Sequence, residues 1–272
     1  MPSQPAASGK GGSASSFDLA RFDPADRPFS SGDKSVDKAR VAELAVELDK
    51  LQDLFYADRR FKLLVVLQGT DTSGKDGTIR GVFGEMSALG VRTAAWKAPS
   101  GEELTHDFLW RIHQKVPAAG EVVLFNRSHY EDVLVPVVKG AIGKEETAQR
   151  FAQINDFERL LSESGTIVLK FFLHISKDEQ RARLQDRLDD PVKHWKFVVG
   201  DLDARKSWDA YQAAYSAAIA ATGTVWAPWV VVPADSKTQR NLMIALAVKA
   251  AMLRLKLRYP RGDPALAKIK VT

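Results

Sequence analysis

The chain has 272 residues, 45% of them hydrophobic, which is enough for one large α/β domain or two small ones with a sizeable core. Its net charge of +5 favours anionic partners such as nucleic acid, a membrane surface or a phosphate-rich substrate, although ordinary enzymes carry a similar excess. The lack of cysteine excludes disulfides, thiolate zinc sites, iron–sulfur clusters and cysteine nucleophiles, and agrees with a cytoplasmic protein.

The first 35 residues differ in composition from the rest of the chain. Residues 1–16 hold almost no large apolar side chain, so burial cannot offset the entropy lost on ordering, and we expect disorder. Residues 17–36 carry three phenylalanines among Asp, Pro and Ser, which suits an extended arm lying on the domain. We find no signal peptide and no apolar run near the ~20 residues of a membrane span. We therefore expect a disordered or extended arm over 1–35 and a single domain over 36–272.

Strand-like and helical segments alternate along the domain. Apolar residues between 37 and 57 recur with helical spacing, which predicts a first packing helix. Apolar runs predict buried strands at 63–67, 92–96, 122–125, 167–174 and 229–232. Further helices are expected at 74–88, 102–115, 144–163, 203–221 and 236–258. This alternation predicts a three-layer α/β fold with a central, parallel, five-stranded sheet.

A phosphate-binding loop follows the first predicted strand. Residues 69–77 are GTDTSGKDG and match G-x-x-x-x-G-K between a buried strand and a helix. The glycines let backbone N–H groups converge on an anion, and the helix adds its positive end. The alternative is a glycine-containing turn that binds nothing. We expect phosphate contacts from seven residues of the loop: Gly69, Thr72, Ser73, Gly74, Lys75, Asp76 and Gly77.

Two acids set this loop apart from that of an ordinary ATPase. Asp76 stands where a Ser or Thr usually ligates magnesium, and Asp71 lies inside the loop, where a carboxylate would repel phosphate. An acid at that position makes sense if it holds Mg²⁺, a hard cation that prefers oxygen ligands. We therefore assign metal binding to Asp71 and expect Asp71 and Lys75 to be catalytic.

The third predicted strand ends in a second polar cluster, NRSHYED at residues 126–132. Ligand sites of α/β sheets gather beyond the carboxyl ends of the strands, so this cluster and the loop should meet. Arg127 can bind phosphate through two hydrogen bonds, and Asn126 replaces the usual metal-binding Asp. Glu131 or Asp132 is close enough in sequence to supply the missing carboxylate. The alternative is a polar helix cap without a ligand.

A candidate lid covers residues 177–206, which mix eight Lys or Arg with seven Asp or Glu. Arg183 and Arg187 are four residues apart, on one helical face. In P-loop kinases a mobile, arginine-bearing segment closes over the transferring phosphate and excludes water. We therefore expect Arg183, Arg187, Lys193 and Lys196 to contact phosphate. The alternative is a surface hairpin laced with salt bridges.

Three long runs carry a resemblance to a known family: LLVVLQGTDTSGKDGTIRGVF, WKAPSGEELTHDFLWRIHQKVPAAGEVVLFNRSHYEDVLV and DEQRARLQDRLDDPVKHWKF. They closely resemble the polyphosphate kinase 2 family over roughly residues 35–258. The resemblance implies a thymidylate-kinase-like P-loop fold with a helical lid, and phosphate transfer between polyphosphate and nucleoside phosphates with Mg²⁺ or Mn²⁺. It matches the family's functional residues to Asp71, Lys75, Arg127, Arg181 and Arg187. On this basis Arg127 and Arg187 join Asp71 and Lys75 as expected catalytic residues.

Asn126 suggests a branch of that family. Many members have Asp at this position, and NRSHYED resembles the class III branch, which implies phosphorylation of both AMP and ADP. Asn126 also moves the expected second metal ligand to Glu131. We expect the acceptor phosphate near Asp71, Asn126 and Arg127, and polyphosphate along Lys75 and the lid arginines.

Two rival functions share parts of this pattern. A nucleoside monophosphate kinase that uses ATP would have the same loop and lid, but Asp76 counts against it. A P-loop protein that binds nucleic acid needs a coherent basic surface, which the mixed charge of 177–206 does not provide. We therefore expect no nucleic-acid or membrane partner, and assembly into a dimer or a tetramer of identical chains.

Overall fold

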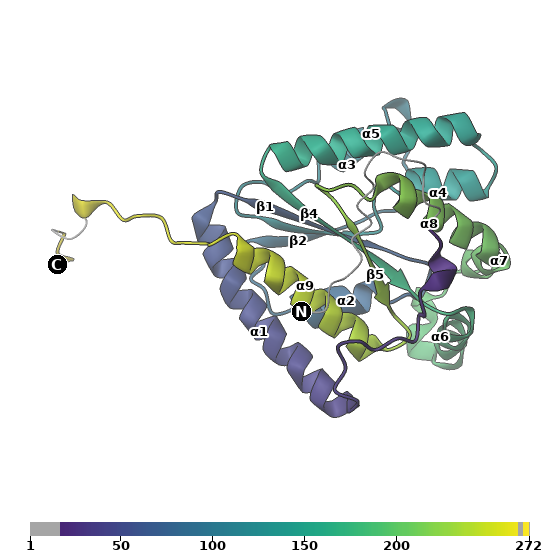
Figure 1. The fold of residues 1–272 in the computed structure, drawn as a ribbon, viewed down its shortest axis with the longest axis horizontal. Helices are drawn as coiled ribbons and strands as arrows, with labels where there is room; N and C mark the ends of the chain where they lie inside the picture. Colours follow the sequence, from purple (N-terminus) through teal and green to yellow (C-terminus); the bar gives the residue numbers. More distant parts are fainter. Residues whose placement is uncertain (1–16, 266–268, 272) are drawn as a thin grey trace.

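One parallel sheet organises the chain. The computed structural model describes residues 17–265 and 269–271, so the disorder expected for 1–16 lies outside the described residues. Five strands pair in the order β2-β3-β1-β4-β5, all parallel (Figure 1). Their bounds are β1 (Lys62–Gln68), β2 (Val91–Ala95), β3 (Val122–Asn126), β4 (Thr166–His174) and β5 (Trp229–Pro233). The prediction of a five-stranded parallel sheet is confirmed.

Helices cover both faces of the sheet (Figure 1). One layer consists of α1 (Lys34–Asp58), α2 (Lys75–Phe83) and α9 (Lys237–Arg254). The other consists of α3 (Trp110–His113), α4 (Glu131–Val138), α5 (Lys144–Glu163) and α8 (Trp208–Thr222). The predicted lid contains α6 (Lys177–Asp189), the 3-10 helix η3 (Pro191–Lys196) and α7 (Gly200–Lys206). Two more 3-10 helices are η1 (Leu19–Arg21) and η2 (Glu103–Thr105).

The central strand explains why its sequence is apolar without a break. Leu63, Val65 and Leu67 face the core under α1, α2 and α9, whereas Leu64 and Val66 face the core under α4, α5 and α8. All five are at most 1% exposed, as expected for a strand covered on both faces. Neighbouring β3 pairs with β1 so that Leu67 lies beside Asn126. This register brings the two predicted polar clusters to the same edge of the sheet.

Four predicted helices differ from the structure, and the one expected over 74–88 already ends at Phe83 as α2. Residues 102–115 form only η2 and the four-residue α3, because the side chain of Asp107 accepts a hydrogen bond from the Leu109 N–H at 2.9 Å and competes with helical bonding. The helix expected over 203–221 is divided at Ser207 into α7 and α8. The last helix ends at Arg254, and Lys256 beyond it adopts a left-handed φ of 49°. None of the described helices is both long and apolar enough to cross a bilayer.

The arm before α1 packs on the domain from residue 17 onward. Leu19 is buried in the core beside α8, and its N–H donates to the Ser216 Oγ at 3.2 Å. Further along, the Phe22 carbonyl lies 3.1 Å from the Nε2 atom of His174, the last residue of β4. The described part of the arm therefore reaches the carboxyl end of the sheet.

Candidate active site

The loop between β1 and α2 is a tight turn that requires glycine at two positions. Gly69 and Gly74 have φ angles of 148° and 102°, which residues with a Cβ rarely adopt. A Cβ added to Gly69 would also lie 2.6 Å from the carbonyl oxygen of Leu173. Helix α2 begins directly after Gly74, so its positive N-terminal end faces the loop. The strand, loop and helix follow one another as the motif predicts.

Lys75 lies underneath this loop. Its Nζ donates to the carbonyls of Gly69 at 2.7 Å and Thr70 at 3.1 Å, and the residue is only 8% exposed. Burial and the nearby Arg127 cation lower the pKa of Lys75 to about 8, against the opposing effect of three carboxylates. Lys75 is therefore charged at neutral pH in a place where an approaching anion would be strongly attracted.

Arg127 connects the loop to the cluster after β3. Its backbone has a left-handed φ of 63°, and its guanidinium pairs with Asp71 and lies 3.4 Å from the Glu131 Oε2. Burial opposes the charge of Arg127, but the carboxylates of Glu131 and Asp71 outweigh it and raise the pKa. Glu131 is fixed further by a 2.9 Å hydrogen bond from the Gln68 Nε2. Three predicted site residues from two strand ends thus converge.

The neighbouring acids take separate partners. Asn126 donates to the Asp76 Oδ1 at 2.6 Å, so the end of β3 contacts the first turn of α2. Asp132 receives two hydrogen bonds from Arg111, at 2.9 and 3.0 Å. Of the two acids that the sequence left open, Glu131 faces Arg127 and Asp132 faces away from it toward Arg111.

Asp71 and Glu131 form a pair of carboxylates that could ligate a divalent cation. Because both carboxylates contact the same guanidinium, they lie close together at the loop. Within the described ranges, no three His, Asp or Glu side chains are grouped as metal ligands. Two carboxylates nevertheless suit Mg²⁺, which commonly takes one or two of them and completes its shell with water and substrate phosphates. The residues therefore fit a cation that is held jointly with phosphate.

Arg183 makes backbone contacts that the sequence did not predict. Its guanidinium donates to the backbone carbonyls of Thr72, Ser73, Ala234 and Asp235, at 2.7 to 3.3 Å. These bonds tie α6 to the loop and to the chain that follows β5. These bonds hold the site together, and Arg183 also lines the cleft between α6 and the loop, so its predicted phosphate contact stays a prediction.

The other basic residues of the predicted lid differ in whether they line the cleft beside the loop. Arg187, Lys193 and Lys196 line the cleft between α6 and the loop, and Arg187 donates to the Lys196 carbonyl at 3.0 Å. Arg181 does not line that cleft: its side chain is 73% exposed and its nearest acid is Asp178 at 3.7 Å. The structure therefore separates Arg181 from the other residues that the resemblance assigns to phosphate.

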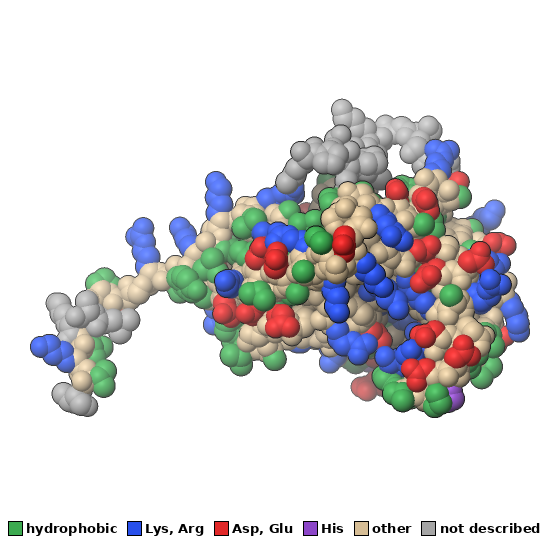
Figure 2. Space-filling view, turned by 90° about the horizontal axis from the view of Figure 1, so that it is seen from below, with side chains coloured by type: hydrophobic (Ala, Val, Ile, Leu, Met, Phe, Trp, Pro, Cys, Tyr) green, Lys and Arg blue, Asp and Glu red, His purple; other side chains and the backbone are tan. Residues whose placement is uncertain are grey.

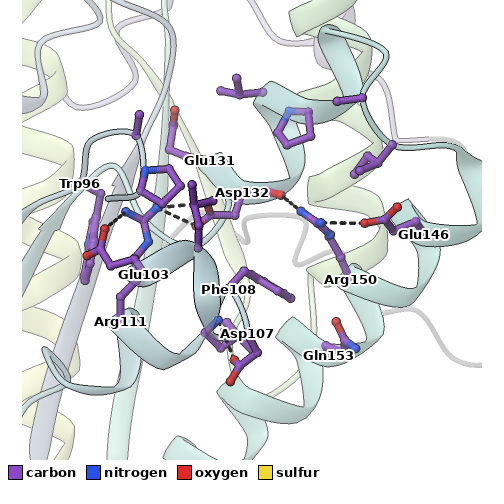
Figure 3. A pocket seen from close by; sticks show the side chains of 18 of the residues that line it. Trp96, Glu103, Asp107, Phe108, Arg111, Glu131, Asp132, Glu146, Arg150 and Gln153 are labelled. Carbon is purple, nitrogen blue, oxygen red and sulfur yellow. Dashed lines mark hydrogen bonds and ion pairs between the residues drawn. The ribbon is translucent and has the colours of Figure 1, made fainter. Parts of the chain in front are cut away.

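Two clefts meet at Arg127. The first, of about 710 Å³, lies between the loop and the predicted lid, and the face in Figure 2 shows Lys and Arg side chains gathered around a hollow. The second, of about 1460 Å³, is bounded by α3, α4 and α5 and contains Trp96, Phe108 and the Arg111–Asp132 pair (Figure 3). Arg127 and Trp96 line both clefts. Two different ligands could thus approach Arg127 from two sides.

Several residues lining these clefts were not expected from the sequence. In the smaller cleft these are Arg80, Lys237 and Arg240. A signal for two of them was present, because Lys237 and Arg240 follow the fifth predicted strand and therefore belong to the same sheet edge. In the larger cleft, Arg111 lies in the short α3, which is only part of the helix predicted over 102–115, so the direction of its side chain was not predictable.

Comparison with known proteins agrees with this geometry. The profile of the family described as polyphosphate kinase 2 (PPK2) matches residues 31–258. An AMP/ADP-polyphosphate phosphotransferase of Meiothermus ruber is 49% identical over 255 residues, covering 94% of this chain and 96% of the relative. An ADP-polyphosphate phosphotransferase of Rhodopseudomonas palustris is 40% identical, covering 81% of each.

A solved structure indicates the same family. The crystal structure of polyphosphate kinase 2 from Arthrobacter aurescens superposes with a TM-score of 0.89 at 45% identity, covering 93% of this chain and 92% of the other. The similarity extends over both helical layers, the sheet and the loop, since nearly the whole of each chain is covered. Fold, loop geometry and relatives together establish that the chain belongs to the polyphosphate kinase 2 family.

Proposed function

We propose that this enzyme transfers phosphoryl groups from inorganic polyphosphate to AMP and ADP, giving ADP and ATP, with Mg²⁺ or Mn²⁺ as cofactor. The observation that carries the proposal is the convergence of Asp71, Arg127 and Glu131 on the Lys75 loop where two clefts meet. The names of the Meiothermus and Rhodopseudomonas relatives support the choice of substrates. They also disfavour the rival nucleoside monophosphate kinase.

The two clefts suggest how the substrates are divided. The larger cleft offers aromatic and mixed polar side chains, which suit a nucleotide with its terminal phosphate at Arg127. The smaller cleft is richer in Lys and Arg and contains the loop, which suits the end of a polyphosphate chain. In this arrangement the donor and acceptor phosphates meet between Lys75 and Arg127.

The chemistry needs little from the protein beyond position and charge. An oxygen of the acceptor phosphate attacks the terminal phosphorus of polyphosphate, a new P–O bond forms, and the bond to the rest of the chain breaks. The shortened chain leaves with the electron pair of that bond. No side-chain base is required, because the acceptor phosphate is already an anion. Lys75 and Arg127 neutralise the charge that develops on the transferred group.

A divalent cation would be held by Asp71 and Glu131, and it would supply positive charge beside the transferring phosphate. We further propose that segment 177–206 closes over the smaller cleft, carrying Arg187, Lys193 and Lys196 toward the donor. Arg183 would anchor the base of this movement on the loop. The cytoplasmic location and the assembly into a dimer or a tetramer stay predictions.

Supplying AMP and Mg²⁺ with either polyphosphate or ATP tests the proposed function. We expect polyphosphate to yield ADP first and ATP later, as measured by chromatographic separation of the nucleotides. Omitting Mg²⁺ and adding a chelator should abolish both products. If only ATP serves as donor, so that AMP and ATP give two ADP, the rival nucleoside monophosphate kinase is the correct function.

A further inference from the structure

The described part of the N-terminal arm is fixed on the domain mainly by one buried side chain. In Figure 1 the arm is the dark purple segment that runs from η1 past the end of β5 to the start of α1. Leu19 is only 1% exposed and lies in the core beside α8, and the rings of Phe17 and Phe22 stack at 5.3 Å. Between residues 23 and 33 no side chain is buried. The position of the arm therefore depends on Leu19.

Two backbone carbonyls of the arm bind the ends of β4 and β5. The Phe22 carbonyl lies 3.1 Å from the Nε2 of His174, the last residue of β4, and this nitrogen donates because a carbonyl oxygen can only accept. The Pro24 carbonyl accepts a hydrogen bond at 3.1 Å from the N–H of Asp235, just after the end of β5. Both contacts lie where β4 leads into α6.

Asp235 connects the arm to α6. Its Oδ1 accepts a hydrogen bond at 2.8 Å from the N–H of Ser176, the N-cap residue of that helix. Its carbonyl accepts another at 2.9 Å from the Arg183 guanidinium, further along the same helix. The N–H of Asp235 is the group that the arm binds. A displacement of the arm would therefore act on a residue that holds α6 at two points.

The first turns of α6 lie directly against the phosphate-binding loop. Gln180 is 2% exposed and donates from its Nε2 to the Asp71 carbonyl at 3.3 Å. Arg183 donates to the carbonyls of the next two loop residues, Thr72 at 2.9 Å and Ser73 at 3.3 Å. Hydrogen bonds thus connect the arm, the chain after β5, α6 and the loop in turn.

We propose that residues 17–24 are a positioning element of the active site, which holds Asp235 in place and thereby fixes α6 against the phosphate-binding loop. These residues line neither of the two clefts, so they would act on the reaction only through α6. Phosphoryl transfer is sensitive to such an effect because alignment of the two reacting groups supplies much of the rate, and a misplacement of about 1 Å can cost a hundredfold. This role goes beyond the proposed function, since it applies to any donor and acceptor that react at the loop.

The substitution Leu19→Asp tests this role in the full-length protein. A carboxylate is strongly disfavoured at a site that is 1% exposed, so the arm should leave its position. We expect amide hydrogen exchange of residues 176–183, measured by mass spectrometry, to accelerate about tenfold or more while exchange in β1 and α5 stays close to that of the wild type. With AMP, polyphosphate and Mg²⁺, kcat should fall about tenfold, with smaller changes in both KM values.

A conservative variant and a matched control accompany this test. Leu19→Met keeps an apolar side chain of similar volume and should retain wild-type exchange and turnover. Phe29→Ala changes an exposed residue of the arm outside the positioning element and should have no effect on either. If Leu19→Asp does not fold, Leu19→Ala takes its place, because it weakens the packing of the arm without burying a charge.

A double-mutant cycle distinguishes positioning from a general loss of stability. Asp235→Ala removes the acceptor of the Ser176 N–H and should itself lower kcat. If the arm acts through Asp235, adding Leu19→Asp to this variant should lower kcat little further. Losses that multiply in the double variant would mean that the arm and Asp235 act independently, and would overturn the proposal.

The exchange measurement also separates this proposal from the proposed function. A folded Leu19→Asp, or Leu19→Ala in its place, that keeps wild-type exchange at residues 176–183 overturns the positioning role. Wild-type turnover despite faster exchange overturns it as well. A wild-type protein inactive with polyphosphate would overturn the proposed function instead, and the exchange comparison would still decide on the arm.

Discussion

The side chains of Asn126 and Asp76 are joined directly, with the Asn126 Nδ2 donating to the Asp76 Oδ1 at 2.6 Å. In many P-loop enzymes the strand end carries the acid and the first turn of the loop helix carries a hydroxyl group. Here the acid stands on the helix and the neutral side chain on the strand. Asp76 and Asn126, the two departures from the common motif, therefore contact each other. As in the common motif, a single carboxylate lies between α2 and β3.

Asn126→Asp should make the protein sensitive to divalent cations. The change places two carboxylates in contact, which costs on the order of 1 kcal/mol at a partly exposed site unless a cation lies between them. We expect a lower Tm than the wild type in the presence of chelator and recovery in excess Mg²⁺, measured by thermal unfolding. Asn126→Ala, which removes the hydrogen bond without adding charge, should show no such recovery. Equal Mg²⁺ responses in the two variants would rule out this explanation.

The lowered pKa of Lys75 predicts a pH dependence of phosphate binding. Its pKa of about 8 means that the charged fraction falls from about nine-tenths at about pH 7 to about one-tenth at about pH 9. Polyphosphate affinity should fall over this range. Because bound phosphate favours the charged form of Lys75, the midpoint of the fall should lie at a higher pH than the pKa of Lys75 without ligand. Titration of polyphosphate at several pH values would measure it, and Lys75→Ala should bind weakly with a flatter profile.

Stability should change in the opposite sense over the same pH range. Because the pKa of Lys75 is lower in the folded than in the unfolded protein, the unfolded state binds more protons above about pH 8. The contribution of Lys75 to the free energy of unfolding therefore rises with pH as its buried charge is lost. A parallel loss of stability and affinity would mean that unfolding, and not Lys75, explains the weaker binding.

Arg187 and Arg181 should differ sharply in importance. Arg187 lines the smaller cleft, whereas Arg181 is exposed on α6 outside it. We expect Arg187→Ala to lower kcat/KM for polyphosphate by about tenfold or more, because it removes a cation near the developing charge. Arg181→Ala should stay within about twofold of the wild type, as for an exposed pair. Steady-state kinetics on both variants would check this, and equal losses would show that α6 rotates on closure.

Much of the site follows from the sequence because parallel strands end at one edge of a sheet. The unbroken apolar run of β1 and the motif after it predicted that Lys75 belongs to a loop between strand and helix, and the run of β3 predicted Arg127 and Glu131 at the same edge. The burial of Lys75 against the Gly69 and Thr70 carbonyls was not predicted, because the sequence indicated a mobile lysine. Side-chain direction on α6 was not predictable in the same way. Arg183 and Arg181 are two residues apart on one helix, yet one bonds to the loop and the other faces solvent.

A buried polar network under the site was also not predictable from the sequence. Glu158 on α5 accepts hydrogen bonds from Lys170 on β4 at 2.6 Å and from the Tyr130 hydroxyl at 2.9 Å, and His129 lies 3.2 Å from it. Burial disfavours its charge, but Lys170 and His129 lower the pKa of Glu158. No spacing rule joins residues 130, 158 and 170, because only the folded sheet and α5 bring them together.

Removing one member of this network should be more harmful than removing both charges. Lys170→Met leaves Glu158 buried without its partner and should cost about 3–5 kcal/mol of unfolding free energy. Lys170→Met combined with Glu158→Gln leaves no buried charge and should recover part of that loss. Urea denaturation of the single and double variants would measure the difference. If the losses simply add, the pair does not act as a unit.

The central claim is that Asp71, within the loop, would help to hold a divalent cation beside the transferring phosphate. The most direct measurement follows ADP and ATP formation from AMP, polyphosphate and Mg²⁺ in the wild type and in Asp71→Asn, with Arg159→Ala on the exposed face of α5 as control. We predict that the wild type and the control form ADP and then ATP, whereas Asp71→Asn is slower by about a hundredfold or more while its Tm stays close to that of the wild type. A folded Asp71→Asn that turns over at the wild-type rate would contradict the claim.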